Sequence, residues 1–184
     1  MSKEVTQERI QEIIEDATYL QDEAEALRYV IDSIPFDQST PGDYSVIDKL
    51  LLLDHLQVNY YRPLFDQATS KSSPSARVQD LASSYADFSI DDENKPDILK
   101  VLGKLSKHRA ALISVMRQIP LIDWEKTLYK DNQKISLYDF AASMVRNDRK
   151  LLKEIADTVM IFQKESQSRR EIKHQSGKKN QNNH

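Results

Sequence analysis

The chain has 184 residues, 39% of them hydrophobic and 30% charged, with a mean hydropathy of -0.63 and a net charge of -3. With no cysteine it cannot form disulfides, thiolate metal sites or a cysteine nucleophile, and its three glycines leave little material for a phosphate-binding loop. From Lys164 onward six Lys and Arg face two Glu, so this end carries +4 and the rest of the chain -7. An acidic body argues against nucleic acid as a partner.

The sequence has no feature that predicts a membrane protein. The N-terminal ten residues are polar and amphipathic, unlike a signal peptide, and no apolar run is longer than the four residues Leu50–Leu53. A membrane-spanning helix needs about 20 apolar residues. We therefore expect a cytoplasmic protein.

The first segment, about 3–34, predicts one amphipathic helix. Its apolar residues recur at steps of three and four, as one face of an α-helix requires. These residues are Ile10, Ile13, Ile14, Ala17, Leu20, Ala24, Leu27 and Ile31. Pro35 ends the helix, and a loop follows up to Asp43.

A second helix is predicted over 45–67. Ser45 and Asp48 have the spacing of a capping box. The four leucines 50–53 point all around a helix, so we expect burial on more than one side. Pro63 predicts a kink or an early end.

Residues 68–96 change in character and predict a long crossover. A serine-rich break comes first, a short helix over 78–88 fits the apolar spacing, and a polar turn follows at 91–94. A long crossover lets the two helices that it joins run parallel.

Two more helices are predicted after the crossover. The third covers 97–119 and ends at Pro120, and an irregular connection up to Lys134 contains Trp124. The fourth begins at Ser136, which has capping-box spacing with Asp139, and extends to about Lys164. The remaining residues are nearly devoid of apolar side chains. We therefore predict one domain over 1–166 and a disordered basic tail over 167–184.

Three segments carry a resemblance to a known family: DYSVIDKLLLLDHLQ (43–57), the leucine-rich third helix with Arg109, and ISLYDFAASMVRNDRKLLKEI (135–155). They resemble the DinB-like superfamily of bacterial four-helix bundles. The resemblance implies an all-α fold, a four-helix bundle of the up-up-down-down type with a long crossover between helices two and three.

The resemblance also implies the place where chemistry would occur. Many members bind zinc or nickel through three histidines, one on helix two and two on helix four. Residues four apart share a helical face, so two imidazoles can converge on one ion. Here the three positions match His55, Asn147 and Leu151, so only one imidazole is present. The resemblance thus implies a degenerate metal site and no cofactor; zinc or nickel would follow only if the site still functioned.

Two interpretations of the inward-facing polar residues stay open. His55 is either a buried histidine satisfied by a hydrogen bond or the remnant of a binding pocket. For Asn147 we prefer a contact with His55 across the bundle, and lining a pocket is the rival. Asp148 matches the family's acidic residue, and it and His108 are candidates for a supporting role. His108 could replace a lost ligand, but a histidine at the edge of the core is the simpler account.

The favoured function is a small-molecule-binding or interaction module that has lost the family's metal site. The alternative is a metal-dependent enzyme, a thiol S-transferase or hydrolase, in which the metal would lower the pKa of a thiol. Dimerisation through bundle faces, common in the family, implies a homodimer. A third idea is that the basic tail binds nucleic acid in a salt-dependent way.

Overall fold

Helices make up most of this protein. The computed structural model describes residues 4–39, 43–70, 76–78, 88–89, 91, 93–94, 96–130 and 133–181. Within them the main helices are α1 (Gln7–Leu27), α2 (Val46–Leu56) with its continuation α3 (Arg62–Thr69), α5 (Ile98–Gln118) and α6 (Leu137–Gln181). No helix in this described part is long and apolar enough to cross a membrane.

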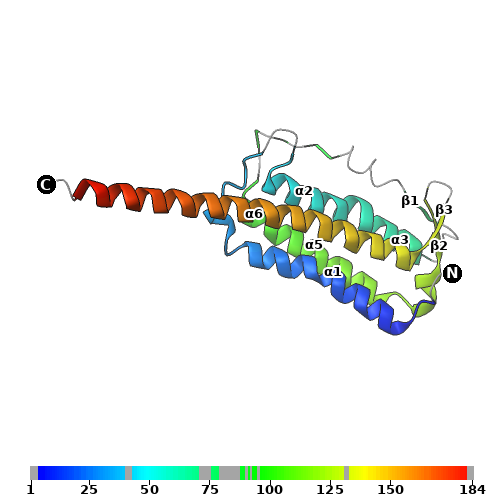
Figure 1. Cartoon of the computed structure of the whole chain (residues 1–184). Coiled ribbons are helices and arrows are strands. Elements are labelled where there is room, and N and C mark those ends of the chain that lie inside the picture. Colours follow the sequence, from blue (N-terminus) through cyan, green and yellow to red (C-terminus); the bar gives the residue numbers. More distant parts are fainter. Residues whose placement is uncertain are drawn as a thin grey trace.

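The helices form a four-helix bundle in which α1 and α2 each pack against both α5 and α6. In Figure 1 α1 and α6 run in one direction, and α2, α3 and α5 run in the other. The bundle has two helices in each direction, and its second and third helices are parallel, as the long crossover predicts, so the all-α four-helix-bundle fold class is confirmed. In chain order the directions are up, down, down and up.

The helix starts follow from local hydrogen bonding. The Ser45 hydroxyl accepts from the Asp48 N–H while the Asp48 carboxylate accepts from the Ser45 N–H, which is the predicted capping box. At α6 the Ser136 hydroxyl accepts from the Asp139 N–H at 3.0 Å. Asp97 caps α5 in the same way. Each cap satisfies a backbone donor that the helix itself leaves unpaired.

The second helix passes Pro63 without ending. A π-helical turn, Gln57–Tyr61, joins α2 to α3, and the Arg62 N–H bonds to the Gln57 carbonyl. Proline lacks the N–H and crowds the carbonyl four residues earlier, so a wider turn lets the helix continue. The same turn is followed by an aromatic cluster in which Tyr60, Tyr61 and Phe65 all contact Phe140.

Helix α1 ends at Leu27, earlier than predicted. After a turn, a 3₁₀ helix (Ile31–Ser33) follows, and Ile31 and Ile34 are still buried. A 3₁₀ turn repeats every three residues, so it keeps the apolar stripe without an α-helix. The periodicity alone could not separate the two.

Three short strands were not predicted. The connection after α5 begins with a 3₁₀ helix (Leu121–Glu125) in which Trp124 is fully buried, and then forms β2 (Thr127–Lys130) and β3 (Gln133–Ser136) as an antiparallel pair. β1 (Ala76–Val78) lies parallel to β2. Val78 is therefore in a strand rather than at the start of a helix, and the rest of the short helix predicted over 78–88 lies almost entirely outside the described residues.

Helix α6 continues well past the predicted end of the domain. It runs to Gln181 and projects from the bundle in Figure 1, whereas the composition predicts a disordered tail after residue 166. Glu, Gln, Lys and Arg are good helix formers, and residues 167–176 contain neither Gly nor Pro. Among the side chains whose burial the structure describes, Val159 is the last buried one, so those of the projecting part lie outside the core.

Candidate functional site

His55 finds its hydrogen-bond partner on its own helix. It is half-buried on α2, and its Nδ1 lies 3.1 Å from the Asn59 side-chain nitrogen, one turn away. Since the amide nitrogen donates, Nδ1 is the acceptor in this contact. The ring also packs near Phe88, with ring centroids 5.5 Å apart. This matches the simpler interpretation, a histidine satisfied by a hydrogen bond.

Asn147 does not bond to His55, so the preferred contact across the bundle is wrong. Asn147 is half-buried on α6 and donates its Nδ2 to the Tyr61 hydroxyl at 3.2 Å. The π turn that carries Tyr61 brings this hydroxyl within reach, and the sequence shows no sign of it. Leu151 is buried in the core, 7% exposed.

Asp148 belongs to an ion pair inside the bundle. Its Oδ2 lies 2.8 Å from Nη2 of Arg109 on α5, and both side chains are buried. Burial raises the pKa of the Asp148 carboxyl above its ordinary value, and the Arg109 charge opposes that shift. In this low-dielectric interior an unpaired charge would be strongly destabilising, so each residue of the pair needs the other.

The Arg109 guanidinium connects all four helices. Its Nε donates to the Gln57 side-chain oxygen at 2.5 Å, and its Nη1 donates to the Ala17 carbonyl of α1 at 3.3 Å. Gln57 in turn donates to the Leu105 carbonyl. We call Gln57, Arg109 and Asp148 the buried network. Its one signal in the sequence is the position of Arg109 between Leu105 and Leu112 on an apolar stripe.

His108 lies elsewhere, between α5 and α2. Its Nδ1 is 2.7 Å from Oδ1 of Asp54, and its side chain is 38% exposed. A partly exposed histidine paired with a carboxylate agrees with the edge-of-core interpretation. Within the described ranges of the chain, it belongs to no group of three or more side chains that could hold a metal ion.

The residues present do not fit a divalent transition metal at the family's position. Among the described residues, no three His, Asp or Glu side chains lie close enough to hold an ion. The Asn147 amide donates a hydrogen bond to Tyr61, and the Leu151 side chain has no atom that can coordinate a metal. One imidazole is too little for tight zinc or nickel binding.

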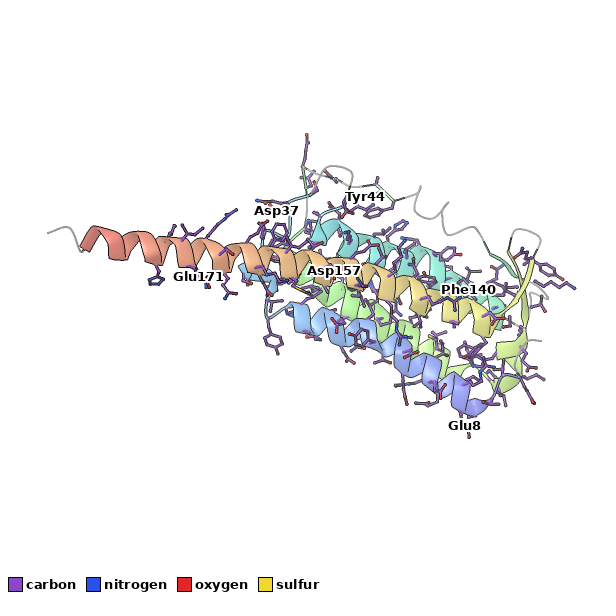
Figure 2. All side chains as sticks on the ribbon, viewed as in Figure 1. Glu8, Asp37, Tyr44, Phe140, Asp157 and Glu171 are labelled. Atoms are coloured by element: carbon purple, nitrogen blue, oxygen red, sulfur yellow. The ribbon has the colours of Figure 1, made fainter. Side chains whose placement is uncertain are left out.

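A pocket lies next to Tyr61, the hydrogen-bond partner of Asn147, where the π turn meets the β2–β3 hairpin and the start of α6. Its volume is about 270 Å³. It is lined by Tyr60, Tyr61, Gln133, Ile135, Asp139, Phe140, Ser143 and Arg146. Figure 2 places the labelled Phe140 at the hairpin end of the bundle, far from Glu171 on the projecting part of α6. We call this space the tyrosine pocket.

Aromatic packing shapes one wall of the tyrosine pocket. Neighbouring residues of an α-helix point about 100° apart, yet Tyr60 and Tyr61 are both buried, with ring centroids 5.1 Å apart. Each ring also lies 5.9 Å from Phe140 on α6. The widened π turn allows both rings to contact the same helix.

Comparison with known proteins shows the fold alone. No protein-family model matches the chain, and no curated protein matches it. Among solved structures it is similar to YfiT from Bacillus subtilis, described as "a probable metal-dependent hydrolase with an unusual four-helix bundle topology". The TM-score is 0.69 at 15% identity, over 86% of this chain and 90% of YfiT. The four-helix-bundle fold implied by the family resemblance is thereby confirmed.

Proposed function

We propose that this protein is a metal-independent small-molecule-binding module whose ligand occupies the tyrosine pocket. The observation that carries the proposal is the contrast between two adjacent places. The family's metal positions offer His55, Asn147 and Leu151, a set without three donors. One hydrogen bond away, through Asn147 and Tyr61, lies a hollow of about 270 Å³ with aromatic walls and polar groups.

The chemistry of the walls suits binding. Ligand sites combine apolar and aromatic surfaces with a few polar groups that fix orientation. Here Tyr60, Tyr61 and Phe140 supply the surface, and Gln133 and Ser143 supply polar atoms. The volume lies just below the ~300–1,000 Å³ typical of drug-sized ligands, so a single-ring molecule is the expected size.

The test separates the pocket from the rest of the protein. Ser143→Leu places a larger side chain at the pocket wall, on a helix position that tolerates leucine. A library of single-ring compounds is screened by ligand-observed NMR in the presence of EDTA. We expect hits for the wild type that Ser143→Leu loses while its thermal unfolding is unchanged. Hits that survive Ser143→Leu unchanged would place binding elsewhere and contradict the proposal.

The second candidate is a metal-dependent hydrolase or thiol transferase, favoured by the fold similarity to YfiT. Elemental analysis of the purified protein discriminates, because one zinc or nickel per chain would favour the enzyme. Thiol-conjugation assays with and without added metal give a second measure, with His55→Ala as the control variant.

A gain-of-function variant tests the geometry that underlies this choice. Asn147→His with Leu151→His restores two imidazoles at i and i+4 on α6, facing α2. If the loss of these two donors is the reason that metal does not bind, the double variant gains zinc affinity and His55→Ala removes it again. If the wild type binds zinc as tightly as the double variant, the two missing imidazoles do not prevent metal binding, and the proposal of a metal-independent module is contradicted.

A homodimer is proposed as well, since the chain exposes several large apolar residues. Tyr29 is 90% exposed and Ile161, on α6 just past the last buried residue, is 56% exposed. Light scattering of the purified protein measures the association directly, and a monomer at high concentration would exclude this proposal.

A further inference from the structure

We infer that the tyrosine pocket selects a small organic monoanion, with an apolar ring and a hydrogen-bond donor at the end opposite the negative charge. This inference rests on the proposed function and adds the class of ligand. It rests on two observations: which charged side chains line the pocket, and which of them already have a partner within the protein.

Arg146 supplies the positive end. It lines the pocket on the exposed side of α6, and in the part of the chain described it has no hydrogen bond and no ion pair. A guanidinium offers five N–H donors in a fixed plane that matches a carboxylate. An unpaired arginine at the rim of a hollow can therefore take its counter-ion from a ligand.

Asp139 supplies the opposite end. It lies seven residues before Arg146, two helical turns away on the same face and about 10 Å along the axis. One of its oxygens accepts from the Ser136 hydroxyl at 2.8 Å, and a carboxylate has further acceptor capacity. Its negative charge repels a second anion, which disfavours dianions, and it can accept a hydrogen bond from the far end of a ligand.

Phe140 and Ser143 lie between the two charges on α6, and the two tyrosines face them from the π turn. The middle of the pocket is therefore lined mainly by aromatic rings, with the Ser143 hydroxyl beside them, and this suits a ligand that carries a ring. A ligand that satisfies all three parts has a carboxylate, one ring and a hydroxyl or amine, in that order.

A second hollow of the described structure lacks this property. It has a volume of about 540 Å³ and lies at the C-terminal end of α5. There Lys126 pairs with Asp123 at 3.2 Å and also bonds to the Ala68 carbonyl, while Asp66 is held by Arg62. Its charges already have partners within the protein, so the hollow gives a ligand no comparable anchor.

The test uses three matched probes: 4-hydroxyphenylacetate, its neutral amide, and phenylacetate, which lacks the hydroxyl. Affinities are measured by isothermal titration or by ligand-observed NMR on the full chain. We expect the acid to bind about tenfold more tightly than the amide, because a charge-assisted hydrogen bond is roughly twice as strong as a neutral one. Phenylacetate falls between them.

Two substitutions assign the effect. Arg146→Gln should abolish the preference for the acid and its salt dependence, and leave amide binding unchanged. Arg117→Gln is the matched control, since Arg117 is also an exposed helical arginine without an ion pair in the described residues, and it lines neither hollow. It should behave as the wild type.

The outcomes separate the two levels of the argument. If Ser143→Leu leaves all three affinities unchanged, the pocket is not the site and the proposed function fails. If Ser143→Leu abolishes binding but the wild type binds 4-hydroxyphenylacetate and its amide with equal affinity, only the inference about charge fails. The inference is also overturned if Arg146→Gln keeps the preference, or if none of the probes binds the wild type at its solubility limit.

Discussion

Two arginines of this protein lie in opposite situations. Arg109 is fully buried in the bundle and has partners on the other three helices. Arg146 is exposed beside the tyrosine pocket and has no ion pair among the described residues. A buried charge is tolerated only when the fold supplies its partners, so Arg109 serves the structure. An exposed charge beside a hollow can be satisfied by water until a ligand arrives, so Arg146 is free to serve binding.

The largest expected effect comes from breaking the buried network. Arg109→Met leaves the Asp148 carboxylate buried without its counter-ion, which should cost about 3–5 kcal/mol of unfolding free energy. Arg146→Gln, the surface counterpart, should change it by no more than about 0.5 kcal/mol. Urea denaturation measures both, and equal effects would erase the distinction between the two arginines.

The double variant Arg109→Met with Asp148→Leu sharpens this result. Removing both charges leaves no unpaired ion in the core, and well-packed apolar replacements of buried ion pairs are often neutral. We expect it to recover most of the stability lost in the single variant. A double variant as unstable as Arg109→Met would mean that packing, and not charge, accounts for the loss.

The pH dependence of stability separates Asp148 from a surface carboxylate. Burial raises the pKa of Asp148, so the folded protein holds that proton more tightly than the unfolded chain. Its contribution is therefore complete below the ordinary pKa of about 3.9 and is lost as the pH rises through the folded pKa. The Lys49 ammonium holds the pKa of Asp43 below its ordinary value, so that contribution is present above the unfolded pKa and is lost as the pH falls through the folded pKa.

Asp148→Asn and Asp43→Asn measure these two contributions. Unfolding free energies are recorded for both variants and the wild type across acidic and neutral pH. The difference between wild type and Asp148→Asn should shrink as the pH rises, and that for Asp43→Asn should shrink as the pH falls. The same trend for both carboxylates would contradict the assignment of Asp148 to a buried environment.

A smaller effect is expected where the two regions meet. Tyr61→Phe removes the hydroxyl that accepts from Asn147, which should cost about 1 kcal/mol. Tyr29→Phe is the control, because Tyr29 is 90% exposed. Thermal unfolding measures both variants. If Tyr61→Phe has no effect on stability, then the link between the metal positions and the tyrosine pocket contributes nothing.

The smallest effect on stability is expected at the end of α6. Truncation after Ser166 removes only residues beyond the core and should change the unfolding free energy by less than about 0.5 kcal/mol. Circular dichroism then tests the projecting helix. If it is helical in solution, truncation lowers the helical signal per molecule; if the predicted disorder holds, the signal per molecule stays the same. The same truncated protein tests whether the basic tail binds nucleic acid.

Much of the fold could be predicted because its signals are local. The apolar stripe of α1, the caps at Ser45 and Ser136 and the break at 68–96 each depend on residues a few positions apart. The strands escaped prediction because four-residue segments such as Thr127–Lys130 carry too short a pattern, and it is pairing with another strand that stabilises them. Past Ser166 the structure continues as a helix where the composition predicts disorder, since a polar segment can be helical without being buried.

Only part of the candidate site, likewise, could be predicted from the sequence. That His55 stands alone, without histidines at 147 and 151, could be read from the sequence. That Asn147 bonds to Tyr61, and that Gln133 reaches the same pocket from a hairpin, could not.

By itself, the sequence determined where the four bundle helices lie, how two of them are capped, that the second and third can run parallel, and which chemical groups are available. Only the tertiary structure decided which polar groups meet: Arg109 with Asp148 in the interior, and Arg146 with no carboxylate of the described chain. Helical periodicity sets the face on which a residue lies, whereas its partner depends on the register between helices. A single π turn at Gln57–Tyr61 changes that register.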